Sequence, residues 1–215
     1  HTSTVPNYGA MEGDEIIIIG GYESGVDAAY HLAKKGKKVV LFDKDNPWDE
    51  ESSDPSVSLS TFSYERMRDS AFGKNVKLFS ETPIISVSQS GKTYSVKTVE
   101  GQIFKSQTQP LLASGFVGSQ SSVSDLFEKR EDGFPLLSER DESTITPGMF
   151  LCGPSVRHDN HDFCFIYKYR QRFAVVAQAI ASSFDIPTED FIKTYKEWGM
   201  YLDDLSCCGQ ECLTC

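Results

Sequence analysis

The sequence predicts an α/β protein built on a parallel sheet, and two patterns support this. Residues 16–19 are four consecutive isoleucines, a fully apolar run typical of a strand that is buried on both faces of a parallel sheet. A glycine-rich turn, an amphipathic helix and a second apolar strand follow within about 30 residues, the length of a βαβ unit. Farther along, three segments of alternating polarity lie between glycine turns, which indicates an antiparallel meander.

The βαβ unit occupies residues 16–43. Its helix is predicted over 26–35, and Gly36 is placed to end it. A second strand over 39–42 ends in Asp43. The helix face expected to pack on the sheet carries Val26, Ala29, Tyr30 and Ala33.

The turn between the first strand and the helix has the composition of a dinucleotide phosphate site. Backbone N–H groups at the helix N-terminus would face a pyrophosphate, and the helix dipole would favour its negative charge. Asp43 lies 23 residues after Gly20, about where a carboxylate reaches a ribose 2′-OH. The residues expected to contact an NAD(P)H cofactor here are Gly20, Gly21, Tyr22, Glu23, Ser24, Gly25 and Asp43.

The glycine motif departs from the usual G-x-G-x-x-G spacing at Tyr22. The glycine normally found there lets the backbone approach the pyrophosphate closely, so Tyr22 either displaces the phosphates or stacks on the cofactor. The alternative is an α/β unit that keeps the fold and binds no nucleotide. Asp43 predicts a preference for NADH over NADPH, and the adjacent Lys44 would act in the opposite direction.

The remaining elements complete the predicted fold class. The order of βαβ unit, helix, strand, meander and strand is typical of a Rossmann-like three-layer α/β domain, in which a meander replaces one crossover. We therefore expect an NAD(P)-binding domain over residues 1–115. The other predicted elements are a helix at 61–69, strands at 76–79, 84–89, 93–99, 102–106, 111–116 and 149–153, a long helix at 163–183 and an amphipathic segment at 188–205.

Composition narrows the range of partners. A net charge of −10 without a Lys/Arg cluster argues against a nucleic-acid surface. No apolar run approaches the ~20 residues of a membrane span, and no signal peptide opens the chain. We therefore expect a cytoplasmic protein that acts on a small-molecule substrate.

Four of the six cysteines, Cys207, Cys208, Cys212 and Cys215, lie within the last nine residues. Four thiols this close could enclose one tetrahedral Zn²⁺. Adjacent thiols could instead exchange electrons with a disulfide substrate, or the tail could be inert. The acidic pair Asp203 and Asp204 favours the metal.

The segment 158–162 (HDNHD) precedes the predicted long helix. We expect Asn160 or Asp162 to cap its first turn rather than bind a metal. Cys152 and Cys164 are expected to be buried small hydrophobes. A basic, aromatic helix face made of Tyr167, Lys168, Tyr169, Arg170 and Arg172 is expected to be packed and solvated.

Five stretches together resemble the two-dinucleotide-binding flavoproteins, and among them the CzcO-like flavin-containing monooxygenases. The glycine turn and helix resemble the nicotinamide-nucleotide site of that family, and LLASGF resembles the strand that crosses back to its FAD domain. The stretches are IIIIGGYESGVDAAYHLAKKG at 16–36, DPSVSLS at 54–60, LLASGF at 111–116, TPGMFLCGP at 146–154 and MYLDDLSCCGQECLTC at 200–215.

The resemblance implies an NAD(P)H-dependent flavoprotein oxidoreductase of monooxygenase or disulfide-reductase type. It assigns residues 116–205 to the C-terminal part of a FAD-binding domain, with flavin contacts at Gly153 and Asn160, and leaves 206–215 as a Cys-rich tail. Such proteins begin with a FAD-binding βαβ unit, and the fifteen residues before Ile16 are too few for one. The resemblance therefore implies that FAD is held only when the N-terminal half is present. The expected partner is a complementing N-terminal FAD-binding piece or a second copy of the chain in a homodimer. The alternative function is a non-catalytic nucleotide-binding fragment with a zinc-binding tail.

Overall fold

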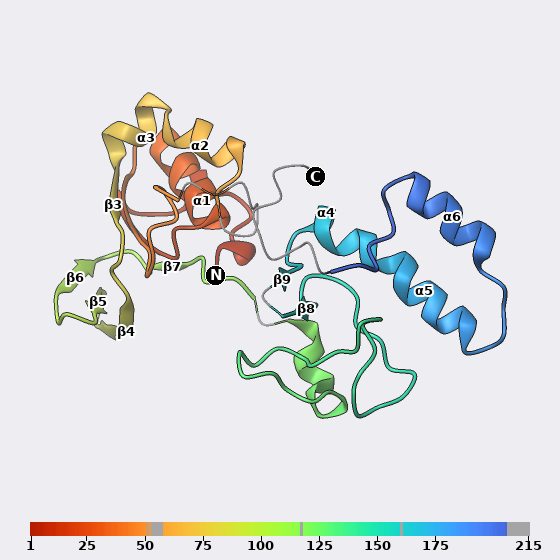
Figure 1. Cartoon of the computed structure of the whole chain (residues 1–215). Helices are drawn as coiled ribbons and strands as arrows, with labels where there is room; N and C mark the ends of the chain where they lie inside the picture. The colour runs from red at the N-terminus through yellow and green to blue at the C-terminus, as the bar shows by residue number, and fades with distance from the viewer. Residues whose placement is uncertain (51, 53–57, 117, 160, 206–215) are drawn as a thin grey trace. The chain divides into compact units, whose positions relative to one another are not determined.

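The structure is a computed structural model that describes the chain except for residues 51, 53–57, 117, 160 and 206–215. The chain divides into two units, unit 1 over residues 1–116 and unit 2 over residues 117–215 (Figure 1). In the described part of the chain, every helix is too short or too polar to span a lipid bilayer.

Unit 1 is built on a four-stranded sheet whose strand order is β3-β2-β1-β7. All of its neighbouring strands are parallel, which confirms the predicted fold class. The last strand is shorter than the six residues predicted, because only two of them pair with β1. The strands are β1 (Glu15–Ile19), β2 (Lys38–Phe42), β3 (Val76–Phe79) and β7 (Leu111–Leu112), and two single 3₁₀ turns, Thr2–Thr4 and Tyr8–Ala10, precede them.

Helix α1 (Glu23–Lys34) begins three residues earlier than the sequence predicted. Tyr22 is extended and takes the N-cap position, and its carbonyl accepts the N–H groups of Gly25 and Val26 at 3.0 Å each. The first helical turn therefore forms directly after the glycine turn. At the other end Gly36 adopts a φ of +78°, as a glycine stop requires.

The predicted helix over 61–69 is two helices, α2 (Thr61–Met67) and α3 (Ser70–Asn75), and the second was missed. Asp69 separates them because its side chain accepts the backbone N–H of Ala71 at 2.8 Å and caps α3. Short polar residues that cap a helix also interrupt the one before it.

The isoleucine run of β1 divides the core of unit 1 into two layers. Ile16 and Ile18 pack with α1 residues such as Leu32, whereas Ile17 packs with Val96 of the meander. Successive side chains of a strand point to opposite faces, so this apolar run joins helices and meander through one sheet. The predicted meander is confirmed as β4 (Ile84–Ser90), β5 (Thr93–Thr98) and β6 (Ile103–Ser106), as Figure 1 shows.

Unit 2 contains little sheet among its described residues. Its two strands form a short hairpin, and its α-helices lie in the second half of the unit, after a 3₁₀ segment near its start (Figure 1). The elements are a 3₁₀ segment (Ser119–Leu126), β8 (Arg157–His158), β9 (His161–Asp162), α4 (Ile166–Tyr169), a 3₁₀ turn (Arg170–Arg172), α5 (Phe173–Ser182) and α6 (Glu189–Glu197).

Two sequence predictions in unit 2 are wrong. Residues 149–153 do not form a strand; pairing with the 141–143 segment is limited to a single bridge at Phe150, and glycines with positive φ lie just before and at the end of the segment. The predicted helix over 163–183 starts only at Ile166 and is interrupted by the 3₁₀ turn. The interruption coincides with Arg172, whose side chain turns into the core.

A buried ion network holds unit 2 together, and this corrects the expectation that Arg172 lies on a solvated helix face. Arg172 is 1% exposed and donates to the fully buried carboxylate of Asp141 from Nε at 3.0 Å and Nη2 at 2.9 Å. His158 Nε2 lies 2.5 Å from the same carboxylate. The remaining guanidinium N–H groups donate to the carbonyls of Glu139 and Leu202. Four segments distant in sequence thus meet at one charge pair.

A test of the α1 packing compares two glycines. A Cβ at Gly25 would lie 1.9 Å from the carbonyl oxygen of Gly20, whereas a Cβ at Gly73 in α3 would meet open space. Gly25→Ala should lower the free energy of unfolding of unit 1 by roughly 1–3 kcal/mol. Gly73→Ala should raise it by up to about 1 kcal/mol through helix propensity. Urea unfolding followed by the fluorescence of buried Trp48 measures both, and equal effects would contradict the packing.

A second test neutralises the buried carboxylate. Asp141→Asn keeps a residue type that tolerates the positive φ of 63° but leaves Arg172 without its counter-charge, so it should destabilise unit 2 by about 3–5 kcal/mol. The control is Glu139→Gln, an exposed side chain whose residue contributes only its carbonyl. Hydrogen–deuterium exchange over residues 118–205 reports the change. Similar protection in both variants would show that the charge pair does not hold unit 2.

Candidate functional site

The glycine turn lies at the carboxyl ends of β1 and β2, the edge at which parallel α/β sheets bind ligands. Gly20 has a φ of +103°, and a Cβ there would lie 2.4 Å from the carbonyl oxygen of Ala113. Its N–H donates to the carbonyl of Phe42 at 2.8 Å, which joins the turn to the next strand. Glycine at positions 20 and 25 is thus required by the packing of the turn itself.

Two backbone N–H groups at the start of α1 are open. The N–H groups of Gly25 and Val26 donate to the carbonyl of Tyr22, whereas those of Glu23 and Ser24 have no acceptor among the described residues. Ser24 is exposed. The partial positive charge of a helix N-terminus lies here, so the geometry suits an anionic ligand.

Tyr22 replaces the usual middle glycine without strain. Its φ of −80° is accessible to any residue, so the backbone does not need glycine. Its hydroxyl donates to the carbonyl of Ser58 at 2.7 Å, and its ring packs against the core of unit 1. The ring is therefore directed toward the segment before α2, and contact with a nucleotide stays a prediction.

Glu23 ties the turn to α2. Its carboxylate accepts the backbone N–H of Ser60 at 2.5 Å, the hydroxyl of Ser60 at 2.9 Å and the hydroxyl of Ser63 at 2.7 Å. Ser60 is the N-cap of α2. One carboxylate thus satisfies donors at the N-terminus of a second helix, and it fixes α2 beside the turn.

Asp43 and Trp48 hold the two successive peptide groups that flank the Cα of Gly21. Asp43 Oδ2 accepts the N–H of Gly21 at 2.5 Å, and Asp43 Oδ1 accepts the N–H of Asp45 at 2.9 Å. Trp48 Nε1 donates to the carbonyl of Gly21 at 2.8 Å. A Cβ at Gly21 would lie 2.4 Å from the Trp48 ring, so only glycine fits.

Sequence reasoning missed the roles of Trp48, Ser60 and Ser63. Trp48 and Ser60 belong to a polar stretch that reads as a surface loop, and their contacts with the turn span 27 and 37 residues. A single tryptophan among polar residues was the available signal. A tryptophan normally buries its ring against other residues and pairs its N–H with an acceptor, and here Trp48 covers the glycine turn.

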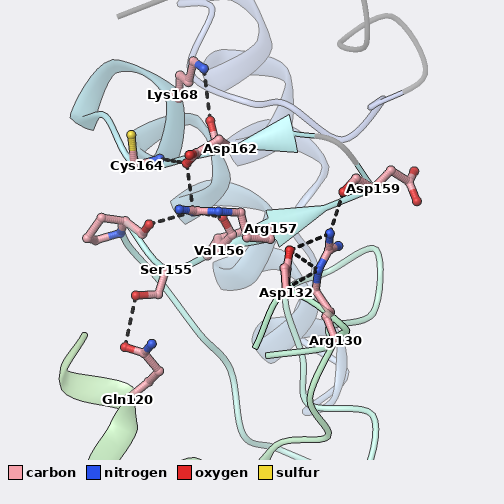
Figure 2. A network of polar contacts seen from close by, with 11 residues as sticks. Gln120, Arg130, Asp132, Ser155, Val156, Arg157, Asp159, Asp162, Cys164 and Lys168 are labelled. Carbon is pink, nitrogen blue, oxygen red and sulfur yellow. Dashed lines mark hydrogen bonds and ion pairs between the residues drawn. The ribbon is translucent and has the colours of Figure 1, made fainter. Parts of the chain in front are cut away.

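In unit 2, Gly153, a predicted flavin contact, precedes the β8–β9 hairpin in the sequence, and the network in Figure 2 holds this hairpin. Arg157 pairs with Asp162 at 2.9 Å and donates to the carbonyls of Pro154 and Val156 at 2.8 Å each. Its guanidinium also lies 4.1 Å from the centre of the Phe134 ring. This arginine therefore fixes both the hairpin and the loop before it.

Two further contacts in Figure 2 attach neighbouring loops to the hairpin. Arg130 pairs with Asp132 at 3.1 Å and donates to the carbonyl of Asp159 at 2.6 Å. Ser155 donates its hydroxyl to Gln120 at 3.0 Å. These contacts attach the segments around Gln120 and Arg130 to the hairpin and to the loop that precedes it.

The predicted helix cap is wrong. The N-cap of α4 is Phe165, and the Asp162 carboxylate instead accepts the N–H of Cys164 at 2.8 Å. Asn160 lies outside the described residues. Gly153 is buried in a turn with a φ of +106°, and its flavin contact stays a prediction.

The expectation of buried cysteines is also wrong, because Cys152 and Cys164 are both exposed. Desolvation by its surroundings and, second, the charge of Asp141 raise the pKa of the Cys152 thiol, so it stays protonated at neutral pH. The four cysteines of the predicted zinc site lie outside the described residues. Among the described residues, no cluster of three or more His, Cys, Asp or Glu could hold a metal, so zinc has no support from the structure.

Comparison with solved structures shows the fold. Bacillithiol disulfide reductases from Bacillus cereus and Staphylococcus aureus are 20% and 16% identical to this chain, each with a TM-score of 0.63 over 82% of it. A pyridine nucleotide-disulfide family oxidoreductase from Enterococcus faecalis V583 is 15% identical, with a TM-score of 0.61 over 82% of the chain. The chain spans 52%, 53% and 40% of the length of these three proteins, respectively.

The sequence also matches a protein family over residues 1–153, a range that includes the whole of unit 1 and the first part of unit 2. That family is described as pyridine nucleotide-disulphide oxidoreductase. The glycine turn, the open N-terminus of α1 and the parallel sheet agree with this description, and we conclude that the chain belongs to the pyridine nucleotide-disulphide oxidoreductase family.

Proposed function

We propose that this chain supplies the NAD(P)H-binding part of a flavoprotein oxidoreductase that reduces a disulfide substrate. The observation that carries the proposal is the N-terminus of α1. There the N–H groups of Glu23 and Ser24 are open, directly after a glycine turn at the ligand-binding edge of the sheet. Family membership supports the nicotinamide nucleotide as the ligand.

The site suits an anionic ligand because it combines a positive helix end with a turn whose shape is already fixed. Hydrogen bonds that exist without ligand hold that shape. A pyrophosphate could therefore be bound without reorganising the turn, which reduces the entropic cost of binding.

Unit 2 does not suit FAD on its own. Its described residues contain a two-stranded hairpin but no strand–glycine turn–helix unit that could hold a second pyrophosphate. The flavin, when bound, accepts a hydride from NAD(P)H and passes two electrons on. The proposal therefore needs a FAD-binding βαβ unit from sequence beyond these 215 residues, on the same or another polypeptide.

Apolar side chains exposed on and between the helices of unit 2 would suit such a partner. A FAD-binding βαβ unit would bring an apolar face of its own to cover them. The half-length coverage of the structural neighbours supports the same partner over a second copy of the chain. The exposed residues are Ile166, Phe173, Ile180, Phe184 and Ile186.

The names of the structural neighbours indicate a disulfide as the substrate class. Two of them act on bacillithiol disulfide, according to their names, and the third is named for the disulfide oxidoreductase family. The proposed net reaction is NAD(P)H plus H⁺ plus a disulfide, giving NAD(P)⁺ and two thiols. The monooxygenase reaction implied by the resemblance would instead consume O₂.

Nucleotide binding is tested at residue 23. Trp48 contacts Gly21, so its fluorescence should change on NADH or NADPH binding in a Trp198→Phe background, with a Kd of roughly 1 μM–1 mM. Glu23→Ala removes only the carboxylate, whereas Glu23→Pro also removes the N–H at a first helical position that tolerates proline. Proline should weaken binding roughly ten- to hundredfold relative to alanine.

Two outcomes would contradict the binding site. A Trp198→Phe protein that binds neither nucleotide up to about 1 mM would exclude a functional site. Equal affinities for the alanine and proline variants would show that the N–H of Glu23 does not contact the nucleotide.

The reaction is tested with the FAD-binding unit present. When the chain is co-produced with that unit, the complex should release two thiols from cystine for each NAD(P)H oxidised, without O₂ consumption. O₂ consumption that matches NAD(P)H oxidation, with no thiol released, would instead identify an oxidase or monooxygenase.

A further inference from the structure

We infer that Asp43 is a positioning residue that fixes the glycine turn, and that it does not select NADH over NADPH through the ribose. The inference rests on the proposed nucleotide site and deepens it. It replaces the expectation, based on sequence position alone, that the carboxylate at the end of β2 binds the ribose 2′-OH.

Both oxygens of Asp43 already have backbone partners. Oδ2 lies 2.5 Å from the nitrogen of Gly21, and Oδ1 lies 2.9 Å from the nitrogen of Asp45. Hydrogen bonds that a carboxylate accepts are about twice as strong as neutral ones, and the first of these is short. The carboxylate is therefore directed back toward the turn.

The bond to Gly21 controls the orientation of the peptides that follow. Asp43 accepts the N–H of Gly21 while Trp48, which is 8% exposed, donates to its carbonyl. The two peptide groups on either side of the Gly21 Cα are thus each held by one hydrogen bond, against a ring that leaves no room for a Cβ. Because Tyr22 and the first residues of α1 follow directly, this contact sets the direction of the open N–H groups of Glu23 and Ser24.

A ribose-selecting role would require the carboxylate to rotate away or to add a third hydrogen bond. Rotation would leave the N–H of Gly21 without its acceptor and would release the turn that the pyrophosphate needs. The two roles therefore predict different responses to substitution. If Asp43 positions the turn, its substitution should weaken the binding of NADH and NADPH alike. If it selects through the ribose, its substitution should change the ratio of the two Kd values.

The test measures the Kd of NADH and of NADPH by Trp48 fluorescence in the Trp198→Phe background. Asp43→Asn presents an amide that can accept at only one of the two N–H groups, so it should weaken both nucleotides roughly ten- to hundredfold and leave their ratio unchanged. The loosened Gly21 peptide should also shift the Trp48 emission to longer wavelength in the absence of nucleotide.

Asp45→Asn is the matched control. It removes the same charge two residues away, from an exposed side chain whose ion pair is with Lys44, and it keeps the backbone N–H that Asp43 accepts. Both affinities should stay within about twofold of the parent protein. Asp43→Glu adds a second test, because glutamate can still bind a ribose hydroxyl but its longer side chain moves the carboxylate off Gly21.

The outcomes separate this inference from the proposed function. Parent protein that binds neither nucleotide would overturn both. If the parent protein binds, either of two results would overturn the positioning role alone. One is a tenfold shift of the affinity ratio toward NADPH in Asp43→Asn, and the other is full NADH affinity in Asp43→Glu. Loss of both affinities in Asp43→Asn and Asp43→Glu, but not in Asp45→Asn, is the expected result.

Discussion

Helix α1 can begin directly at the end of the glycine turn only because Gly25 lets its backbone lie against the carbonyl of Gly20. Any side chain at position 25 would overlap that oxygen. This close approach places the first turn of the helix at the carboxyl edge of the sheet, where the N–H groups of Glu23 and Ser24 have no acceptor among the described residues. The helix end, the Asp43 and Trp48 contacts and the position of α2 all depend on it.

The two units are stabilised by different interactions. Unit 1 has an apolar core on each side of one sheet, and its polar contacts concentrate at the turn. Unit 2 has little sheet among its described residues. Beside an apolar cluster that includes Val156 and Phe163, it buries the carboxylate of Asp141 with its arginine and histidine partners. A buried charge of this kind requires nearly all of its hydrogen bonds, so it specifies how the loops of unit 2 meet.

The sequence predicted the periodic parts of the fold well and the side-chain contacts poorly. The apolar run of β1 and the alternation of the meander depend on local patterns, and both were confirmed. The burial of Arg172 was not predictable, because its partner Asp141 lies 31 residues earlier in a loop segment that has no distinguishing pattern. At the site, the glycine turn was recognisable. The Trp48 contact and the three hydrogen bonds that Ser60 and Ser63 donate to Glu23 depend on tertiary structure.

A dinucleotide site at the start of α1 is tested most directly by the ¹H–¹⁵N correlation spectrum of the whole chain, recorded as NADH is added. We expect the amide resonances of Glu23 and Ser24 to show the largest shifts, moving downfield as their N–H groups bind the pyrophosphate. Resonances of the meander should stay in place. Saturable shifts confined to other residues, or no shifts at all, would contradict a dinucleotide site at the start of α1.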